Sequence, residues 1–215
     1  SFSVTNDVLS RARTDQSTGE LISNIYPSNY TTAMSSCMHL YEEDLPIGTG
    51  AEGVYFSVSS DSTPLSAEYF GIAVYEWNDI QSTGWGDFTL NQLNPIYLSD
   101  YFFADDSLKE KSVYHEFVKV VNDTLFPEPI KLEKSQRYLV CIEYQGGTAL
   151  DIAFGYDNFL DYGSNSAYNP DFGPGRLNID GTPPFNGISG DWYNGWSSAD
   201  APSIGLKVGN YSFVN

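Results

Sequence analysis

The two histidines and the many carboxylates are the side chains of this sequence that could perform catalysis. Histidine is the usual general base near neutral pH, and His39 and His115 both fall in segments with strand character. No Gly-x-Ser-x-Gly elbow or other nucleophile motif accompanies them. A glycosidase needs two carboxylates about 5–10 Å apart, and Glu76 and Glu143 are the best candidates. Because acids within strands usually face solvent, the sequence predicts a protein that is not an enzyme.

Acids and amides in one loop form a second group of candidate ligands. Calcium takes six to eight oxygens from carboxylates, amides and backbone carbonyls, usually on loops. Such groups occur at short spacing at Asp157, Asn158, Asp161 and Asn165. The stretch does not match the EF-hand pattern, and the same residue types are common in ordinary Asx turns. Calcium is therefore the one cofactor that the sequence suggests, with turn formation as the alternative role.

Aromatic residues in loops rich in glycine and aspartate could bind carbohydrate. Aromatic rings pack on the apolar faces of sugars, and rings with a polar group suit half-exposed positions. The candidates are Trp85, in Ser-Thr-Gly-Trp-Gly-Asp, and Trp192, Tyr193 and Trp196, in Gly-Asp-Trp-Tyr-Asn-Gly-Trp. Large rings in such loops can equally cap the hydrophobic core, which we expect of Trp192 and Tyr193.

Charge and composition restrict the class of partner. The chain has 28 acidic and 10 basic residues among 215, a formal net charge of −18. Such a surface repels nucleic acid and anionic membranes, and no apolar run reaches the roughly 20 residues of a membrane span. The sequence starts at Ser1 with no basic and apolar leader, as expected of a mature or excised extracellular protein. We expect an extracellular or cell-surface location, no nucleic-acid partner and no membrane insertion.

The two cysteines, Cys37 and Cys141, both lie in segments predicted as strands. Free cysteines are often buried as small apolar residues. An oxidising compartment would instead permit a disulfide, if the two Cα atoms come close enough. The sequence leaves both interpretations open.

The elements that must position these side chains are strands. Sixteen tyrosines and 13 phenylalanines favour strands, and no ten residues keep a helical period. Tyr69–Trp77 is almost continuously apolar, which is typical of a central strand. Ala149–Gly155 is expected to form a hairpin with Arg137–Tyr144 across Gly146-Gly147. The other expected strands are Ala33–Tyr41, Glu52–Ser59, Val113–Val121 and Ser203–Val208.

Long loops separate the expected strands. Residues 81–111 form an insertion, and residues 156–200 hold most of the glycine, asparagine and proline punctuation. Residues 1–25 are expected to be an edge strand or a lead-in segment. No interdomain linker is evident, so we expect one domain over residues 1–215. About eight to ten strands at this spacing predict an all-β, antiparallel β-sandwich with a jelly-roll-like fold.

From about residue 69 to residue 208, the order of motifs resembles a known family. The matching residues are Pro129, Leu132, Tyr138-Leu139-Val140 and Trp192-Tyr193. They resemble the jelly-roll-like β-sandwich modules of large extracellular bacterial proteins exported by type IX secretion, with Lys134-Ser135 where the family often has Ala-Gly. The resemblance implies secretion, surface display and a role in adhesion or polymer binding.

These observations predict a non-catalytic extracellular or cell-surface module for adhesion or for binding carbohydrate or another polymer. The recognition surface is expected on the loops at residues 81–111 and 156–200. The expected partners are an extracellular glycan or polymer, or neighbouring modules or subunits. The alternative is a structural subunit of a surface filament or virion, in which residues 1–25 would pair with the open sheet edge of a neighbour.

Overall fold

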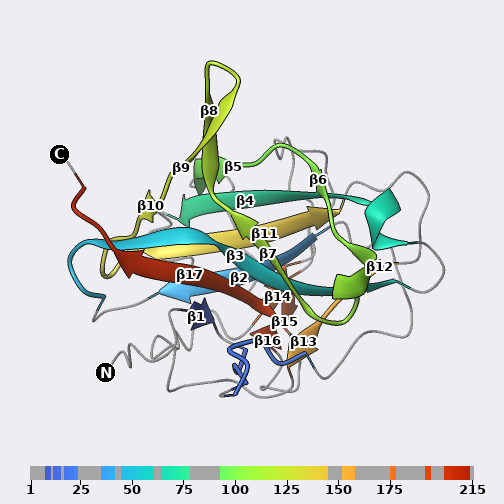
Figure 1. Cartoon of the computed structure of the whole chain (residues 1–215). Helices are drawn as coiled ribbons and strands as arrows, with labels where there is room; N and C mark the ends of the chain where they lie inside the picture. Colours follow the sequence, from blue (N-terminus) through green and yellow to red (C-terminus); the bar gives the residue numbers. More distant parts are fainter. Residues whose placement is uncertain are drawn as a thin grey trace.

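Strands provide almost all of the regular structure (Figure 1). The computed structural model describes residues 8–10, 12–15, 17–23, 35–41, 45–60, 64–77, 93–144, 152–157, 175–177, 192–194 and 201–213. Its strands form two main antiparallel sheets and three separate two-stranded pairs. No helix within these ranges is long and apolar enough to cross a membrane.

The first sheet has six strands and is organised around the long strand β3. β17 pairs along one side of β3, and β1 pairs with β17. Because β17 occupies that side, β10 and β7 must pair along the other, and β12 pairs with the last three residues of β3. These strands are β1 (Val8–Ser10), β3 (Thr49–Ser60), β7 (Ser112–Glu116), β10 (Ile130–Lys131), β12 (Ile152–Phe154) and β17 (Ile204–Asn210).

The second sheet has five strands, in the order β2-β11-β4-β5, with β6 also pairing with β4. β4 lies between β11 and β5, so its predicted central position is confirmed. Cys141 of β11 lies opposite Cys37 of β2. The strands are β2 (Ser35–Tyr41), β4 (Tyr69–Trp77), β5 (Leu93–Leu98), β6 (Phe102–Phe103) and β11 (Arg137–Tyr144).

The order of pairing confirms the jelly-roll fold. β1 pairs with β17, β2 with β11, β3 with β7 and β10, and β4 with β5. The chain therefore pairs as one long hairpin, first strand with last, and successive pairs alternate between the two sheets. One long hairpin that is wrapped so that its strand pairs form two sheets is the arrangement of a jelly roll.

The hydrophobic core lies between the two sheets, where alternate residues of every main strand point inward. The rings of Phe56 in β3 and Phe70 in β4 have their centroids 5.7 Å apart and join the two layers. Complete burial of each such side chain stabilises the fold by roughly 1.5–3 kcal/mol. The predicted alternation of β11 is confirmed, since the core contains Tyr138, Val140, Ile142 and Tyr144.

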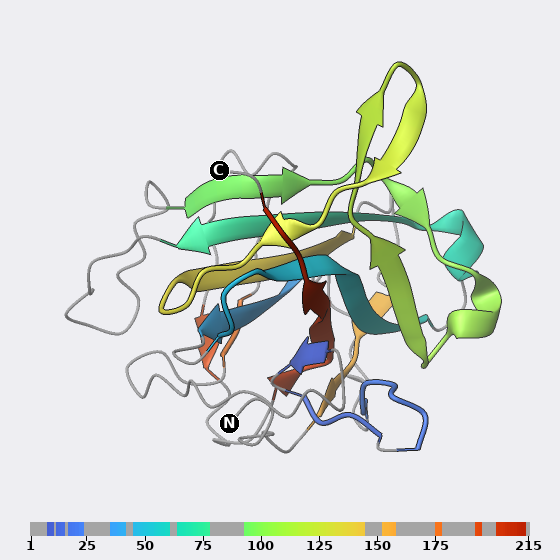
Figure 2. The ribbon, with the colours of Figure 1, turned by 60° about the vertical axis from the view of Figure 1, so that its left-hand side comes forward.

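The predicted strand Val113–Val121 is divided into two. It breaks at Phe117, which is fully buried and packs against Tyr97 with ring centroids 4.5 Å apart and a tilt of 47°. β8 (Val118–Val121) then leaves the sheet and forms a hairpin with β9 (Thr124–Pro127), which projects from the body of the domain (Figure 2).

The predicted hairpin of Ala149–Gly155 with β11 is wrong. β12, within this segment, pairs with β3 in the other sheet. Both edges of β11 are already occupied, one by β2 and the other by β4. No edge of β11 is therefore free to accept a third strand.

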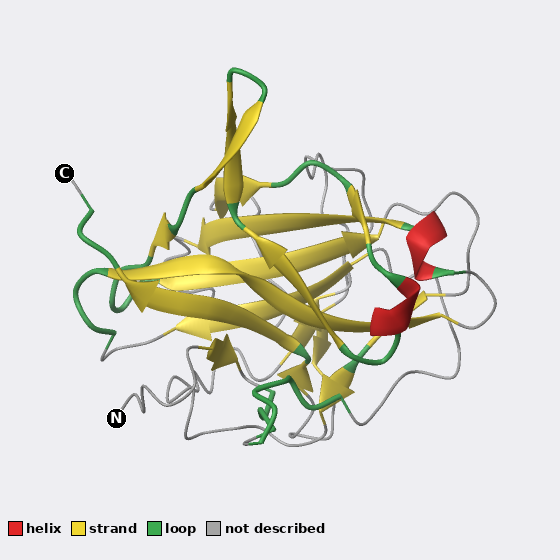
Figure 3. Cartoon of the chain, in the orientation of Figure 1, coloured by secondary structure: helices red, strands yellow, loops and turns green. Residues whose placement is uncertain are grey.

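The two long segments predicted as loops contain short elements of their own (Figure 3). Residues 81–111 include β5, β6 and the 3₁₀ turn η3 (Asp106–Leu108), and residues 78–92 lie outside the described residues. A second 3₁₀ turn, η1 (Leu65–Ala67), precedes β4. Strands described within residues 156–200 are β13 (Tyr156–Asp157), paired with β16 (Ala201–Pro202), and β14 (Gly175–Leu177), paired with β15 (Trp192–Asn194).

Candidate functional site

The aromatic residues predicted to bind carbohydrate lie largely beyond the part of the chain that the structure describes. Trp85 and Trp196 are outside the described residues. Trp192 and Tyr193 lie in β15, where only their backbone is described. These four predictions therefore stay predictions.

Of the predicted calcium ligands, the structure describes only Asp157. Its side chain is fully buried, and both carboxylate oxygens accept hydrogen bonds from the Arg13 guanidinium, at 2.7 and 2.8 Å. Asn158, Asp161 and Asn165 lie outside the described residues. Among the residues that are described, no three His, Cys, Asp or Glu side chains form a metal-binding group. In this structure Asp157 binds the N-terminal segment to β13.

The two carboxylates suggested for glycoside hydrolysis do not form a pair. Glu143 lies opposite Gly71, five residues before Glu76 on β4. At about 3.3 Å per residue this places the two acids about 16 Å apart along the strand. Gly71 and Glu76 are offset by five positions, an odd number, so the two carboxylates also point to opposite faces of the sheet. This separation exceeds what acid–base hydrolysis by a carboxylate pair allows.

Of the two histidines, the structure describes the side chain of His115 alone. The ring of His115 stacks on Phe102 with centroids 4.2 Å apart, and burial lowers the pKa of His115. Only the backbone of His39 is described, in β2. The structure thus places His115 in an aromatic contact at the edge of the core.

A row of aromatic rings covers the face of the first sheet that is directed away from the core. Val54 and Phe56 point inward, so Tyr55 between them points outward. Tyr55 lies opposite Tyr114 of β7, with ring centroids 4.7 Å apart and a tilt of 38°. Beyond the end of β17, the rings of Tyr211 and Phe213 are 5.7 Å apart. We call these four residues, Tyr55, Tyr114, Tyr211 and Phe213, the aromatic strip.

Glycines lie directly beneath three of these rings. A Cβ atom at Gly53 would lie 2.6 Å from the Tyr114 hydroxyl and 2.7 Å from its Cε2. A Cβ atom at Gly50 would lie 2.7 Å from Cδ2 of Tyr211 and 2.8 Å from Cζ of Phe213. Real Cβ contacts are almost never this short. The rings therefore rest on the sheet surface because the residues beneath them have no side chains.

An ion pair lies between the rings of the aromatic strip. Glu52 accepts a hydrogen bond from the Tyr211 hydroxyl at 2.6 Å and pairs with the Lys207 ammonium at 2.9 Å. Lys207 also lies 5.7 Å from the centroid of the Tyr114 ring, a cation–π distance. The polar groups are thus linked to the rings on both sides of them.

These contacts fix the charge states of the polar groups. The hydrogen bond from Tyr211, aided by Lys207, lowers the pKa of Glu52. The hydrogen bond to Glu52 raises the pKa of Lys207. Burial and the hydrogen bond to Glu52 raise the pKa of Tyr211 to about 12. At neutral pH a carboxylate and an ammonium therefore face each other, and their charges cancel.

The aromatic strip is open to solvent but closed at one end by the N-terminal segment. Tyr114 is 38% exposed. Beyond Tyr55 and Tyr114, the next outward-pointing residues of β3 and β7 are Ser57 and Ser112. The backbone N–H of Leu21 donates a hydrogen bond to the Ser112 hydroxyl at 3.0 Å. Leu21 also forms a bridge with Thr14, so this segment folds back over the sheet beside Tyr55. The strip is therefore a surface of limited length.

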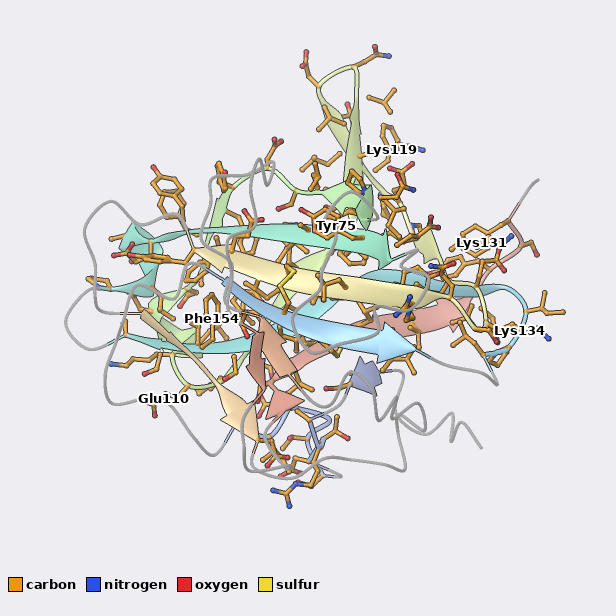
Figure 4. All side chains as sticks on the ribbon, turned by 180° about the vertical axis from the view of Figure 1, so that it is seen from behind. Tyr75, Glu110, Lys119, Lys131, Lys134 and Phe154 are labelled. Atoms are coloured by element: carbon orange, nitrogen blue, oxygen red, sulfur yellow. A yellow bond between two sulfur atoms is a disulfide. The ribbon has the colours of Figure 1, made fainter. Side chains whose placement is uncertain are left out.

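The outward face of the second sheet has a different character (Figure 4). Cys37 and Cys141 form a disulfide there, with Cα atoms 4.1 Å apart, which answers the question left open by the sequence. Two residues further along β11, Glu143 is 3% exposed. Burial raises its pKa to about 7. Its Oε1 atom has no hydrogen-bond partner among the described residues.

The geometry of the aromatic strip suits recognition of a ligand that has both apolar and hydroxyl surfaces. Its rings come from β3, β7 and the segment after β17, so only the folded topology brings them together. The local signal in the sequence was the set of glycines at Gly50, Gly53 and Gly209, which lie in the adjacent strands β3 and β17. Comparisons with protein-family models, curated proteins and solved structures found no match for this chain.

Proposed function

We propose that this protein is a non-catalytic carbohydrate-binding module and that the aromatic strip is its binding surface. The observation that carries the proposal is the placement of Tyr114, Tyr211 and Phe213 over glycine, which lets atoms of each ring pack directly on the sheet surface. The exposed parts of these rings are then available to a ligand. Sugars present apolar C–H faces that pack on such rings, and their hydroxyls need polar partners nearby.

The polar groups needed for sugar hydroxyls lie among the rings. Glu52 offers acceptor oxygens, Lys207 offers donors, and the Tyr211 hydroxyl can do both. The side chains of Lys207 and Glu52 are 38% and 26% exposed, so a ligand can reach them. Their mutual contacts hold them in place before binding, which reduces the entropy cost of ordering them.

We place this module outside the cell, at the cell surface or secreted. The Cys37–Cys141 disulfide supports this location, because disulfides persist mainly in oxidising compartments. The resemblance to modules of proteins exported by type IX secretion supports the same location and a role in adhesion. Assembly through residues 1–25 has less support, since β1 already pairs with β17 of its own chain.

A glycan array probed with the purified protein and two variants tests the proposal. We expect the wild-type protein to bind a defined set of glycans and Tyr114→Ala and Tyr211→Ala to lose at least about tenfold in affinity, or about 1.4 kcal/mol. Tyr101→Ala is the matched control, since this tyrosine is 47% exposed and its ring lies next to Gly71 of the second sheet. The variant Trp85→Ala tests the loop predicted from the sequence.

Two results would contradict the proposal. Absence of binding by the wild-type protein to every glycan would remove the carbohydrate function. Binding that survives both tyrosine substitutions but not Trp85→Ala would move the site from the aromatic strip to the loop. Circular dichroism of each variant verifies that the fold is intact.

A further inference from the structure

We infer that the aromatic strip binds several consecutive units of an extended, uncharged, β-1,4-linked polysaccharide lying along β3. The inference rests on the proposed function and specifies the class of ligand. It follows from the length of the strip, from its open form and from the charges along it.

The length of the strip exceeds a single sugar ring. One group of rings lies at Tyr55, and the other lies over Gly50, five residues away on β3. Because β3 has one extra residue in a bulge between them, the partners of these positions on β17, Gly205 and Gly209, are four residues apart, which at about 3.3 Å per residue is about 13 Å. A monosaccharide can reach one group only, whereas a chain of several units contacts both.

The form of the strip favours a flat, extended chain. The rings lie on the surface of a sheet, and the glycines beneath them allow ring atoms to lie close to the sheet backbone. Equatorial β-1,4 linkages hold successive sugars in an extended ribbon whose faces carry C–H groups. Such a ribbon can lie on both groups of rings at once, while the ion pair between the groups meets hydroxyls at the ribbon's edge.

The charges along the strip disfavour an acidic polysaccharide. The cation at its centre, Lys207, is paired with Glu52 at 2.9 Å. On the neighbouring strand β10, Lys131 is paired with Glu133 at 2.6 Å. The chain as a whole carries a net charge of −18. A polyanion would therefore meet long-range repulsion without an uncompensated cation to bind.

Calorimetric titration with linear oligosaccharides of increasing length tests this inference. The probes are β-1,4-linked oligomers of glucose, xylose and N-acetylglucosamine, with polygalacturonate as the acidic probe. For at least one neutral series we expect affinity to rise about tenfold or more from the disaccharide to the hexasaccharide. We expect no measurable binding of polygalacturonate.

The variant Tyr211→Ala distinguishes a long site from a short one. It removes a ring at one end of the strip, so it should abolish the gain in affinity from the disaccharide to the hexasaccharide. Tyr211→Phe keeps the ring and loses only the hydrogen bond to Glu52, so it should retain most of the gain. Thermal unfolding of each variant provides the folding control.

The outcomes separate this inference from the proposed function. Equal affinity for disaccharide and hexasaccharide, or binding only of glycans outside the three neutral series, would overturn the inference and leave carbohydrate binding standing. Tighter binding of polygalacturonate than of the neutral oligomers would also overturn it. Absence of binding to any glycan, on the array and in titration, would overturn both.

Discussion

The ring of Tyr114 occupies the space that a side chain at position 53 would need. Tyr114 is in β7 and Gly53 is in β3, and a Cβ atom on the glycine would lie 2.6 Å from the tyrosine hydroxyl. The same Cβ would lie 2.5 Å from the backbone oxygen of His115. Ring and glycine are thus complementary, because a side chain at position 53 would displace the ring.

The substitution Gly53→Ala should therefore displace Tyr114 and weaken the sheet. We expect a loss of about 1–3 kcal/mol in the free energy of unfolding, typical of overpacking, together with weaker glycan binding. Chemical denaturation and calorimetry measure the two effects. Gly71→Ala, in the second sheet, is the matched control: its Cβ would lie 3.1 Å from a ring atom of Tyr101. An unchanged stability and affinity for Gly53→Ala would show that Tyr114 does not depend on the glycine.

The Glu52 carboxylate should make the aromatic strip sensitive to acid. Its pKa is lowered in the folded protein from an ordinary value of 4.5. Its stabilising contribution is therefore present above pH 4.5 and lost as the pH falls through the folded-state pKa. We expect glycan affinity to fall below about pH 4.5 in the wild-type protein. Glu52→Gln should lose affinity at neutral pH and show little further decline in acid; an identical decline in both would exclude Glu52 as the titrating group.

The buried Glu143 should give the opposite dependence on pH. Its pKa is raised from 4.5 to about 7 because burial disfavours the carboxylate. The folded state holds the proton more tightly than the unfolded state, so stability falls as the pH rises from 4.5 to about 7 and is level above that. We expect Glu143→Gln to remove this fall and to gain at least about 1 kcal/mol at pH 8, since one pKa unit corresponds to about 1.4 kcal/mol.

Urea denaturation across this pH range measures the effect of Glu143. Glu76→Gln is the control, because Glu76 points to the other face of the same sheet and accepts a hydrogen bond from Asn94. If the wild-type protein and Glu143→Gln follow the same curve, the carboxyl group of Glu143 titrates normally and contacts water.

Removal of the disulfide should destabilise the domain strongly. Cys37 and Cys141 are 104 residues apart, and closing a loop of about 100 residues restricts the unfolded chain by about 4–5 kcal/mol. We expect the double substitution of both cysteines by alanine to lower the free energy of unfolding by about 2–5 kcal/mol. Thiol titration of the denatured wild-type protein should find no free thiol. Two free thiols, with unchanged stability in reductant, would contradict the pairing.

The strands with a strong local pattern could be predicted from the sequence. Tyr69–Trp77 and Arg137–Tyr144 match β4 and β11 in full, because their apolar runs are bounded by Asn78-Asp79 and Gly146-Gly147. Val113–Val121 was predicted as one strand because it contains no glycine or proline at the break. The burial of Phe117 against Tyr97 sets that break, and this contact is not local in sequence.

The candidate site could not be predicted in the same way. Tyr55, Tyr114 and Tyr211 are far apart in the chain and meet only through the pairing of β3 with β7 and β17. Tyrosine is abundant here, 16 residues in all, so its presence does not single out a position. The sequence points instead to the tryptophans, because they lie in predicted loops rich in glycine and aspartate. Glu143 was selected from the sequence for its position in a strand, whereas its buried surroundings became clear only from the fold.

The path of the chain between the two cysteines determines how the domain would respond to a pulling force. β1 and β17 are antiparallel neighbours, and Val8 lies opposite Lys207, so both chain ends leave from the same end of this pair. Tension applied to the two ends would open these strands one hydrogen bond at a time. The disulfide would keep the segment between Cys37 and Cys141, which are 104 positions apart, from being stretched. Tyr55 and Tyr114 lie inside that protected segment and Tyr211 lies outside it, so a load on the chain would remove one end of the aromatic strip first.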